Sequence, residues 1–304
     1  MWTRDLERVY RCAKQGIIPR LLRSSNSHDP CEEEYDSQAF TKHCIGVKGL
    51  YNLGNTCFMN SILQPLLHIP DMAAHFLSYS RTAHRKGNCK IEYCVACEMD
   101  SLFVRMFNGN RKPVCPSEML YAVWKASSEM AGYEQQDAHE FFLCVRSELH
   151  RSLSGQKFNC TCIIHSLFAG VLQSDLTCPE CRSHAETFDP FLDISLDLIQ
   201  HGHYMTSVKD CLDHFTRSET ISMESYKCPQ CGSHQEELQK RMLIRAAPKI
   251  LVIHLKRFEN GAARLKIDRP VSFPLYLDLQ NYTVEYQEDP DGMKGFDSNR
   301  MSPY

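Results

Sequence analysis

The chain changes rhythm near residue 158, from helix-like spacing of apolar residues to strand-like patterns. Residues 56–69 form an apolar helical run, and Pro65 inside it should kink or shorten the helix. Further helices are expected at 99–107, 116–130 and 135–153, the last with one apolar face.

Strand-like segments follow this change of rhythm. The sequence predicts strand structure within 160–178, in the alternating stretch 188–198, and at 250–258 and 271–279. Helices followed by an antiparallel sheet region predict the α+β class.

Composition divides the chain into three parts. Residues 1–45 are irregular and polar, so an N-terminal arm or linker is expected there. Residues 46–279 carry the periodic segments and should form one large domain. Residues 280–304 are polar, with Pro, Gly, Asp and Asn, and we expect a disordered tail.

The bulk numbers exclude some classes of partner. Hydrophobic residues make up 43% and charged residues 23%, as in ordinary globular proteins. A formal charge of -3 gives no reason to expect a nucleic acid or an anionic membrane as a direct partner. The sixteen cysteines, with no secretory signal visible, favour metal ligation or catalysis over disulfides.

Cys57 follows a glycine-rich turn and stands at the start of the first predicted helix. Free backbone N–H groups and the helix dipole at that place favour a thiolate. Together with a side-chain amide they can also hold an oxyanion, and Asn52 and Asn55 are both candidate donors. The alternative is a buried structural thiol near the helix start.

The segment GLYNLGNTCFMNSILQ, residues 49–64, resembles the cysteine box of the ubiquitin-specific proteases nearly position by position. This resemblance implies that Cys57 is the nucleophile and Asn52 the oxyanion-hole residue. Pro65 departs from the small residue that the family has there.

Two later segments resemble the same family. GYEQQDAHEF, residues 132–141, is similar to its Q-Q-D box, which implies that Gln136 and Asp137 bind the basic ubiquitin tail. The alternative, that Asp137 only caps a helix, is compatible with this role. APKILVIHLKRF, residues 247–258, resembles the core strand, on which His254 should be a packed or hydrogen-bonded residue and not catalytic.

Two C-P-x-C knuckles, Cys178 to Cys181 and Cys228 to Cys231, supply four thiolates. Such a set fits a closed tetrahedral structural zinc site. By the resemblance this region corresponds to the fingers that cradle ubiquitin. The alternatives are a site that has lost its metal and reduced surface thiols.

A second zinc site is expected from His84, Cys89, Cys94 and Cys97, three thiolates and one imidazole. This insertion resembles the subgroup of the family that works in the SAGA transcriptional coactivator complex.

A third site is open. Cys160 and Cys162, with His150 or His165, supply zinc-type ligands, but a C-x-C pair is weak evidence without a fourth ligand. The alternative is a pair of strand cysteines.

The family's catalytic histidine lies in a G-H-Y box after the core strand, yet residues 259–304 contain no histidine. Gly202, His203 and Tyr204 read as G-H-Y, but they lie between the knuckles and are not expected to supply the base. We therefore expect a domain truncated at its C-terminal palm, with little hydrolase activity by itself.

Taken together, the resemblance implies a papain-like cysteine protease of the ubiquitin-specific protease type, with a thumb of helices, a palm sheet and zinc-bearing fingers. It implies a deubiquitinase that hydrolyses the isopeptide bond at ubiquitin's C-terminal glycine, on monoubiquitinated histone or other nuclear proteins. It further implies a SAGA-like complex as partner and a nuclear location, with the cytoplasm as a second compartment. The alternative is an inactive ubiquitin-binding or scaffold protein.

Overall fold

The structure is a computed structural model in which the chain forms two compact units, Met1–Ile164 and His165–Tyr304. It describes residues 48–78, 89–108, 112–153, 160–200, 202–257 and 266–288. The arm expected at 1–45 lies outside the described residues. No described helix has the length and apolar character needed to cross a membrane.

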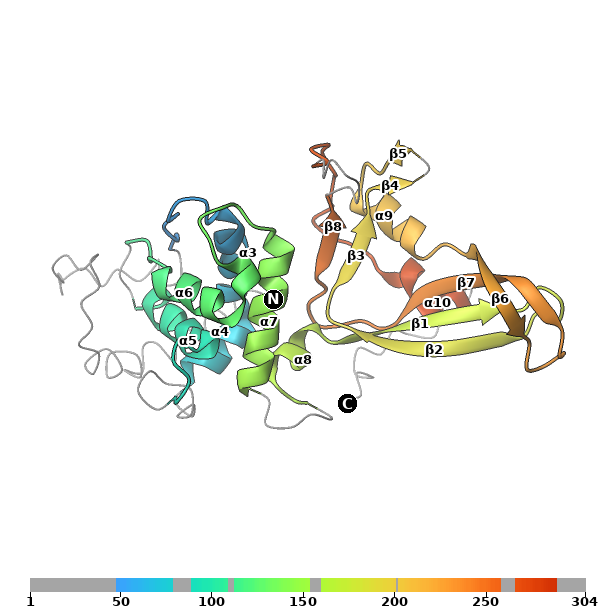
Figure 1. Ribbon diagram of the computed structural model, residues 1–304, viewed down its shortest axis with the longest axis horizontal. Coiled ribbons are helices and arrows are strands. Elements are labelled where there is room, and N and C mark those ends of the chain that lie inside the picture. The colour runs from blue at the N-terminus through green and yellow to red at the C-terminus, as the bar shows by residue number, and fades with distance from the viewer. Residues whose placement is uncertain are drawn as a thin grey trace. The chain divides into compact units, whose positions relative to one another are not determined.

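The first unit is helical (Figure 1). Its described helices are α3 (Cys57–Leu67), α4 (Pro70–Leu77), α5 (Val95–Met106), α6 (Ser117–Ala126), the 3₁₀ turn η2 (Ser128–Met130) and α7 (Ala138–Leu153). In α5 the buried residues Met99, Leu102, Phe103 and Met106 recur every three or four positions, which gives one core-facing stripe. Burial of such a side chain contributes about 1.5–3 kcal/mol.

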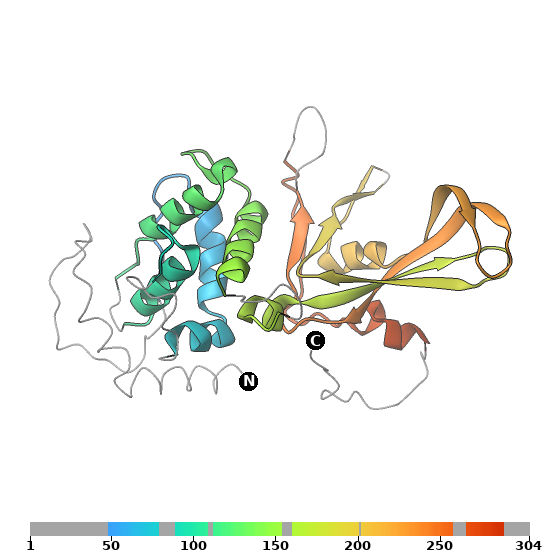
Figure 2. The same cartoon turned by 60° about the horizontal axis from the view of Figure 1, so that its bottom comes forward.

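Helices α3 and α7 lie side by side in both Figure 1 and Figure 2. Phe58 packs edge-to-face against Phe141, with ring centroids 5.7 Å apart. Because Phe58 is the second residue of α3 and Phe141 the fourth of α7, the N-terminal ends of the two helices come together.

Four helices differ from their expected bounds, and α5 begins at Val95, four residues before the expected start. Helix α3 continues through Pro65 and ends two residues later, so the proline shortens the predicted run. The helix expected at 116–130 is interrupted at Ser127, whose backbone is extended (φ -136°, ψ 112°). The helix expected from residue 135 begins at Ala138.

The second unit contains a four-stranded antiparallel sheet in the order β2-β1-β7-β6. The strands are β1 (Gly170–Thr177), β2 (His184–Phe191), β6 (Glu219–Lys227) and β7 (His234–Ala246). Residues 163–168, expected as strand, form the short helix α8 (Ile163–Phe168). Its buried residues Ile164, Leu167 and Phe168 have helical spacing, which a short apolar run conceals.

A smaller layer packs on the strand ends. It consists of the parallel pair β3 (Ile194–Asp197) and β8 (Ile253–Lys256), the hairpin β4 (Ile199–Gln200) and β5 (His203–Tyr204), and helix α9 (Val208–Phe215). Ser207 caps α9 by accepting a hydrogen bond from Asp210 N at 3.0 Å. The core of this unit joins β3, α9 and β7 through Leu196, Leu212 and Ile244.

The strand expected at 250–258 is confirmed in part, and the strand expected at 271–279 is wrong. The first is limited to the four residues of β8, and the second makes only one bridge, from Ser272 to Ser207. Leu275 and Tyr276 are 95% and 93% exposed, whereas Val271, Leu277 and Leu279 pack partly buried against the core, so this segment contributes apolar contacts without forming a strand.

Residues 280–288, expected as the start of a disordered tail, form η3 (Gln280–Tyr282) and α10 (Val284–Glu288). Tyr282 and Val284 are buried, and the Tyr282 hydroxyl donates to Asp213 Oδ1 at 2.8 Å. Burial and the Asp213 carboxylate raise the pKa of Tyr282, so the phenol remains a donor. Two apolar anchors in a polar segment fix the segment to the core. Residues 289–304 lie outside the described part.

Replacing Tyr282 with phenylalanine tests this attachment. Tyr282→Phe should lower the free energy of unfolding by about 1 kcal/mol, because Asp213 loses its donor. Chemical denaturation measures the change. Tyr286→Phe, in α10, is the matched control and should stay within about 0.5 kcal/mol of the unmodified chain. Equal losses in both variants would contradict the role of the hydrogen bond.

Candidate functional site

A tight loop brings Cys57 to the first position of α3. Gly54 has a φ of +98°, which side-chain-bearing residues rarely adopt, and a Cβ there would meet no atom within 4 Å. Glycine is therefore needed for its backbone angle and not for space. The loop leaves Cys57 exposed at the helix start, where open N–H groups and the helix dipole favour an anionic sulfur.

The geometry distinguishes the two candidate amide donors. Asn52 Oδ1 accepts hydrogen bonds from Thr56 N at 3.2 Å and from Thr56 Oγ1 at 2.9 Å. Its amide nitrogen therefore faces away from Thr56 and is available to a substrate. Asn55 Nδ2 instead donates to Tyr133 O at 2.9 Å. The arrangement favours Asn52 as the oxyanion donor.

The Q-Q-D segment ends at the start of α7. Asp137 Oδ1 accepts a hydrogen bond from His139 N at 2.6 Å, which is the capping contact considered from the sequence. Gln136 and Asp137 are both partly exposed. Capping uses one carboxylate oxygen, so the same side chain can also bind a ligand.

The loop before Cys57 and the loop before α7 are far apart in sequence but meet in space. The hydrogen bond from Asn55 to Tyr133 O joins them, and Phe58 and Phe141 pack directly behind. The structure thus brings the two predicted boxes together within one unit.

The histidines are placed as follows. Within the described residues of the first unit, no histidine is hydrogen-bonded to Cys57. His203 is exposed in the β5 strand of the small hairpin. His254 lies on β8 with its Nδ1 3.0 Å from Ser195 Oγ, so it is a hydrogen-bonded strand residue as expected.

The four knuckle cysteines converge where the β1–β2 and β6–β7 turns lie side by side (Figure 2). The sulfur atoms of Cys178 and Cys231 are 3.9 Å apart, and those of Cys181 and Cys228 are 3.6 Å apart. Zinc–thiolate bonds of about 2.3 Å in a tetrahedron separate the sulfurs by about 3.8 Å. This donor set therefore fits one zinc ion.

The two knuckles share one backbone design. A backbone hydrogen bond closes each turn. Arg182 N donates to Cys178 O at 3.0 Å in the first knuckle, and Gly232 N donates to Cys228 O at 2.9 Å in the second. Both donors have positive φ, 56° and 73°. A hydrogen bond from the Ser183 hydroxyl lowers the pKa of Cys228 to about 6, which favours the thiolate that a metal requires.

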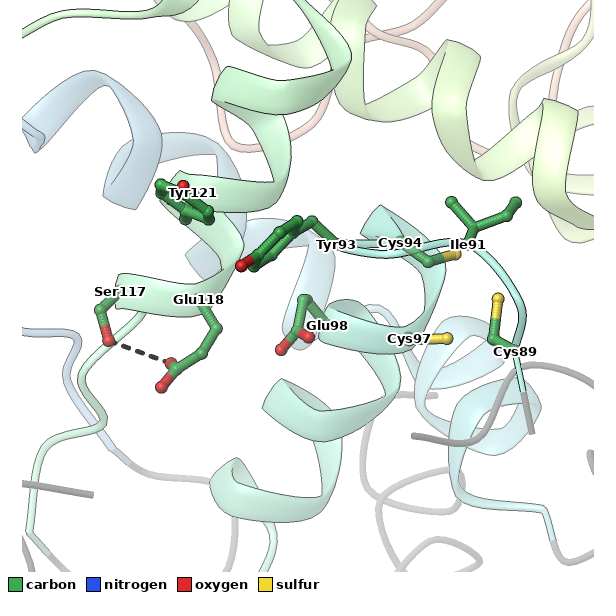
Figure 3. Close-up of a pocket in the computed structure, with 9 residues that line it drawn as sticks. All are labelled: Cys89, Ile91, Tyr93, Cys94, Cys97, Glu98, Ser117, Glu118 and Tyr121. Atoms are coloured by element: carbon green, nitrogen blue, oxygen red, sulfur yellow. Dashed lines mark hydrogen bonds between the residues drawn. The ribbon is translucent and has the colours of Figure 1, made fainter. Parts of the chain in front are cut away.

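Three cysteines form a second cluster, in which the sulfur atoms of Cys89, Cys94 and Cys97 lie within 4.8 Å and point toward one another (Figure 3). Cys94 and Cys97 are buried. The cluster borders a cavity of about 530 Å³, which Ile91, Tyr93, Glu98, Ser117, Glu118 and Tyr121 also line. The fourth predicted ligand, His84, lies outside the described residues and stays a prediction.

The third cluster is more complete than the sequence suggested. His150 Nδ1 is 3.5 Å from Cys162 Sγ and 3.7 Å from Cys160 Sγ. His165 in α8 joins them, with one ligand atom of each residue within 4.8 Å of the others. The sequence left a choice between the two histidines, and both lie in the cluster. Two thiolates and two imidazoles are a common zinc ligand set.

Comparison with known proteins extends these observations. The family model described as "Ubiquitin carboxyl-terminal hydrolase" matches residues 48–294. The human protein "Ubiquitin carboxyl-terminal hydrolase 22" is 41% identical over 280 residues, covering 82% of this chain and 53% of that protein. Human "Ubiquitin carboxyl-terminal hydrolase 27" is 39% identical over 291 residues, covering 86% of this chain and 65% of that protein.

Solved structures of proteins with a similar sequence also share the fold of this chain. A chain of the SAGA DUB module of Ubp8, Sgf11, Sus1 and Sgf73 bound to monoubiquitin aligns with a TM-score of 0.69 and 31% identity, covering 89% of this chain and 60% of that chain. A chain of the same kind of module bound to ubiquitin aldehyde aligns with a TM-score of 0.64 and 34% identity. The alignment covers 78% of this chain and 53% of that chain. The present chain spans about half the length of several curated relatives that it matches.

Metal content tests the three clusters. Native mass spectrometry should show tightly held zinc, with one ion lost in Cys178→Ala or Cys231→Ala and a different one lost in Cys160→Ala or His150→Ala. Loss of either ion should also lower the free energy of unfolding, because metal binding is coupled to folding. Cys211→Ala, at a buried cysteine outside all three clusters, is the control and should keep the full count.

An unchanged zinc count in both knuckle variants would contradict the four-cysteine site. The second cluster is tested in the same way by Cys94→Ala, and His84→Ala then shows whether the imidazole is its fourth ligand.

Proposed function

This chain belongs to the ubiquitin carboxyl-terminal hydrolase family, and from that premise we propose that it is a thiol-dependent deubiquitinase. The observation that carries the proposal is an exposed Cys57 at the start of α3, preceded by the Asn52 amide whose oxygen is already bonded. That combination provides a stabilised thiolate and a donor for the oxyanion.

In the proposed reaction the Cys57 sulfur attacks the carbonyl carbon at ubiquitin's C-terminal glycine. The carbonyl oxygen becomes an oxyanion that Asn52 Nδ2 and the first N–H groups of α3 stabilise. The C–N isopeptide bond then breaks, the lysine amine leaves with a proton, and water releases the thioester. A base must accept the thiol proton, and by resemblance to the family this is a histidine.

Asp137 and Gln136 are proposed to hold the ubiquitin tail. Their loop touches the loop of the nucleophile through the hydrogen bond from Asn55 to Tyr133 O. A tail bound at the start of α7 would therefore end close to Cys57. The capped carboxylate is fixed in direction and suits an arginine of the tail.

The four-stranded sheet is proposed as the fingers that cradle ubiquitin. Zinc at the four knuckle cysteines would clamp the tips of both hairpins and restrict their motion. The ion is structural in this account, because four protein thiolates leave it no open position for catalysis.

We further propose a SAGA-like coactivator complex as partner, monoubiquitinated histone or other nuclear proteins as substrates, and a nuclear location. Support comes from the SAGA DUB module structures that the chain resembles and from its similarity to ubiquitin carboxyl-terminal hydrolase 22. Regulation of transcription at chromatin would follow from such an association.

A non-catalytic ubiquitin-binding protein is the alternative function. A reactive thiol separates the two functions, because a binding protein has no need of an activated sulfur.

Covalent labelling tests the choice. Ubiquitin carrying a C-terminal vinyl electrophile should add once to the full chain, since the Cys57 thiolate is exposed at the tail site. Intact-mass measurement should show no addition to Cys57→Ala. Cys115→Ala, at a partly exposed cysteine of the same unit, is the control and should label normally. Binding of ubiquitin without any labelling of the unmodified chain would support the non-catalytic alternative.

Removal of one charge tests the tail site. Asp137→Asn keeps a good helix cap but loses the carboxylate, and should weaken ubiquitin binding about tenfold or more by calorimetry. Glu134→Gln removes a charge from the same exposed loop and should leave the affinity unchanged. With ubiquitin lacking its C-terminal tail, Asp137→Asn should have no effect. A normal affinity of Asp137→Asn for full-length ubiquitin would leave only the capping role.

A further inference from the structure

A buried threonine precedes the nucleophile, and its hydroxyl has an unusual use. Thr56 is the N-cap residue of α3, yet its side chain makes no capping hydrogen bond. A threonine in this position ordinarily accepts a bond from the second or third N–H of the helix. Thr56 Oγ1 instead donates to Asn52 Oδ1 and accepts from Leu53 N, both at 2.9 Å.

This use of the hydroxyl fixes the Asn52 amide. Oδ1 receives two donors from Thr56, its O–H and its N–H, and the N–H is shared with Gly54 O. If the amide were reversed, Nδ2 would face the Thr56 N–H, and two donors would oppose each other. Thr56 is only 7% exposed, so water does not easily replace these partners, whereas Asn52 is open to solvent.

The same arrangement leaves the start of α3 open. The N–H groups of Cys57, Phe58 and Met59 have no intrahelical acceptor, and the described residues provide no other. A capping threonine would have occupied one of them. The first N–H groups of α3, on one side of Thr56, and Asn52 Nδ2, on the other, therefore remain free to donate hydrogen bonds.

We infer that Thr56 is a positioning residue that holds the Asn52 amide with Nδ2 toward the oxyanion and keeps the first N–H groups of α3 open to it. It acts through Asn52 and does not contact the substrate. The inference rests on the proposed deubiquitinase function, because only an acyl-transfer reaction requires an oxyanion donor at this place.

Ubiquitin aldehyde is a suitable probe, because its addition to the thiol places an oxygen where the oxyanion would lie. The Cys57 sulfur bonds to the aldehyde carbon, the C=O π bond breaks, and the thiol proton ends on that oxygen. The product is a hemithioacetal, and nothing is oxidised or reduced. Unmodified ubiquitin forms no such bond and reports on the remaining interface.

Affinities for both probes are measured on the full chain. Thr56→Val keeps the shape but removes the hydroxyl, and should weaken aldehyde binding about tenfold with ubiquitin binding unchanged. Thr56→Ser restores the hydroxyl and should restore the aldehyde affinity. In an Asn52→Ala background, Thr56→Val should have no further effect, because the two residues act as one unit.

Each other outcome is decisive. The preference is the ratio of the affinity for ubiquitin aldehyde to the affinity for unmodified ubiquitin. If this ratio is the same in Thr56→Val as in the unmodified chain, the inference is overturned and the proposed function stands. A parallel loss of both affinities in Thr56→Val, or additive losses with Asn52→Ala, would show that Thr56 only supports the fold. No preference for the aldehyde in the unmodified chain would overturn the proposed function itself, and the inference with it.

Discussion

The hydrogen bonds between Asn52 and Thr56 are the interaction on which the site depends. They close a loop that the positive φ of Gly54 makes possible, and α3 begins directly after it. Cys57, the proposed nucleophile, is thereby exposed at the start of a helix. Helix packing then fixes the second half of the site, because Phe58 and Phe141 hold the starts of α3 and α7 together.

The four-cysteine cluster lies in a region that has little apolar core. The hairpin tips at Cys178 and Cys228 extend beyond the core of the second unit, and strands β2 and β6 are the edges of its sheet. The cluster of His150, Cys160 and Cys162 brings together the end of α7 and the start of α8. Cross-links through an ion restrict such segments where burial of side chains cannot.

The sequence predicted which cysteines come together better than it predicted the boundaries of the elements. Knuckles and boxes depend on residue type and spacing, so the four-cysteine cluster and the cluster of Cys89, Cys94 and Cys97 came together as expected. The 271–279 segment was misread, because an apolar pattern cannot show whether a partner strand exists. The burial of Tyr282 and the use of both His150 and His165 depend on tertiary contacts that no local pattern contains.

The position of the oxygen in a covalent complex tests the central claim most directly. In a crystal structure of this chain with ubiquitin aldehyde, we expect a bond from Cys57 Sγ to the C-terminal glycine carbon. The hemithioacetal oxygen should lie about 3 Å from Asn52 Nδ2, with Asn52 Oδ1 still bonded to Thr56. An adduct on a different cysteine, or an oxygen directed away from Asn52, would contradict this account of the site.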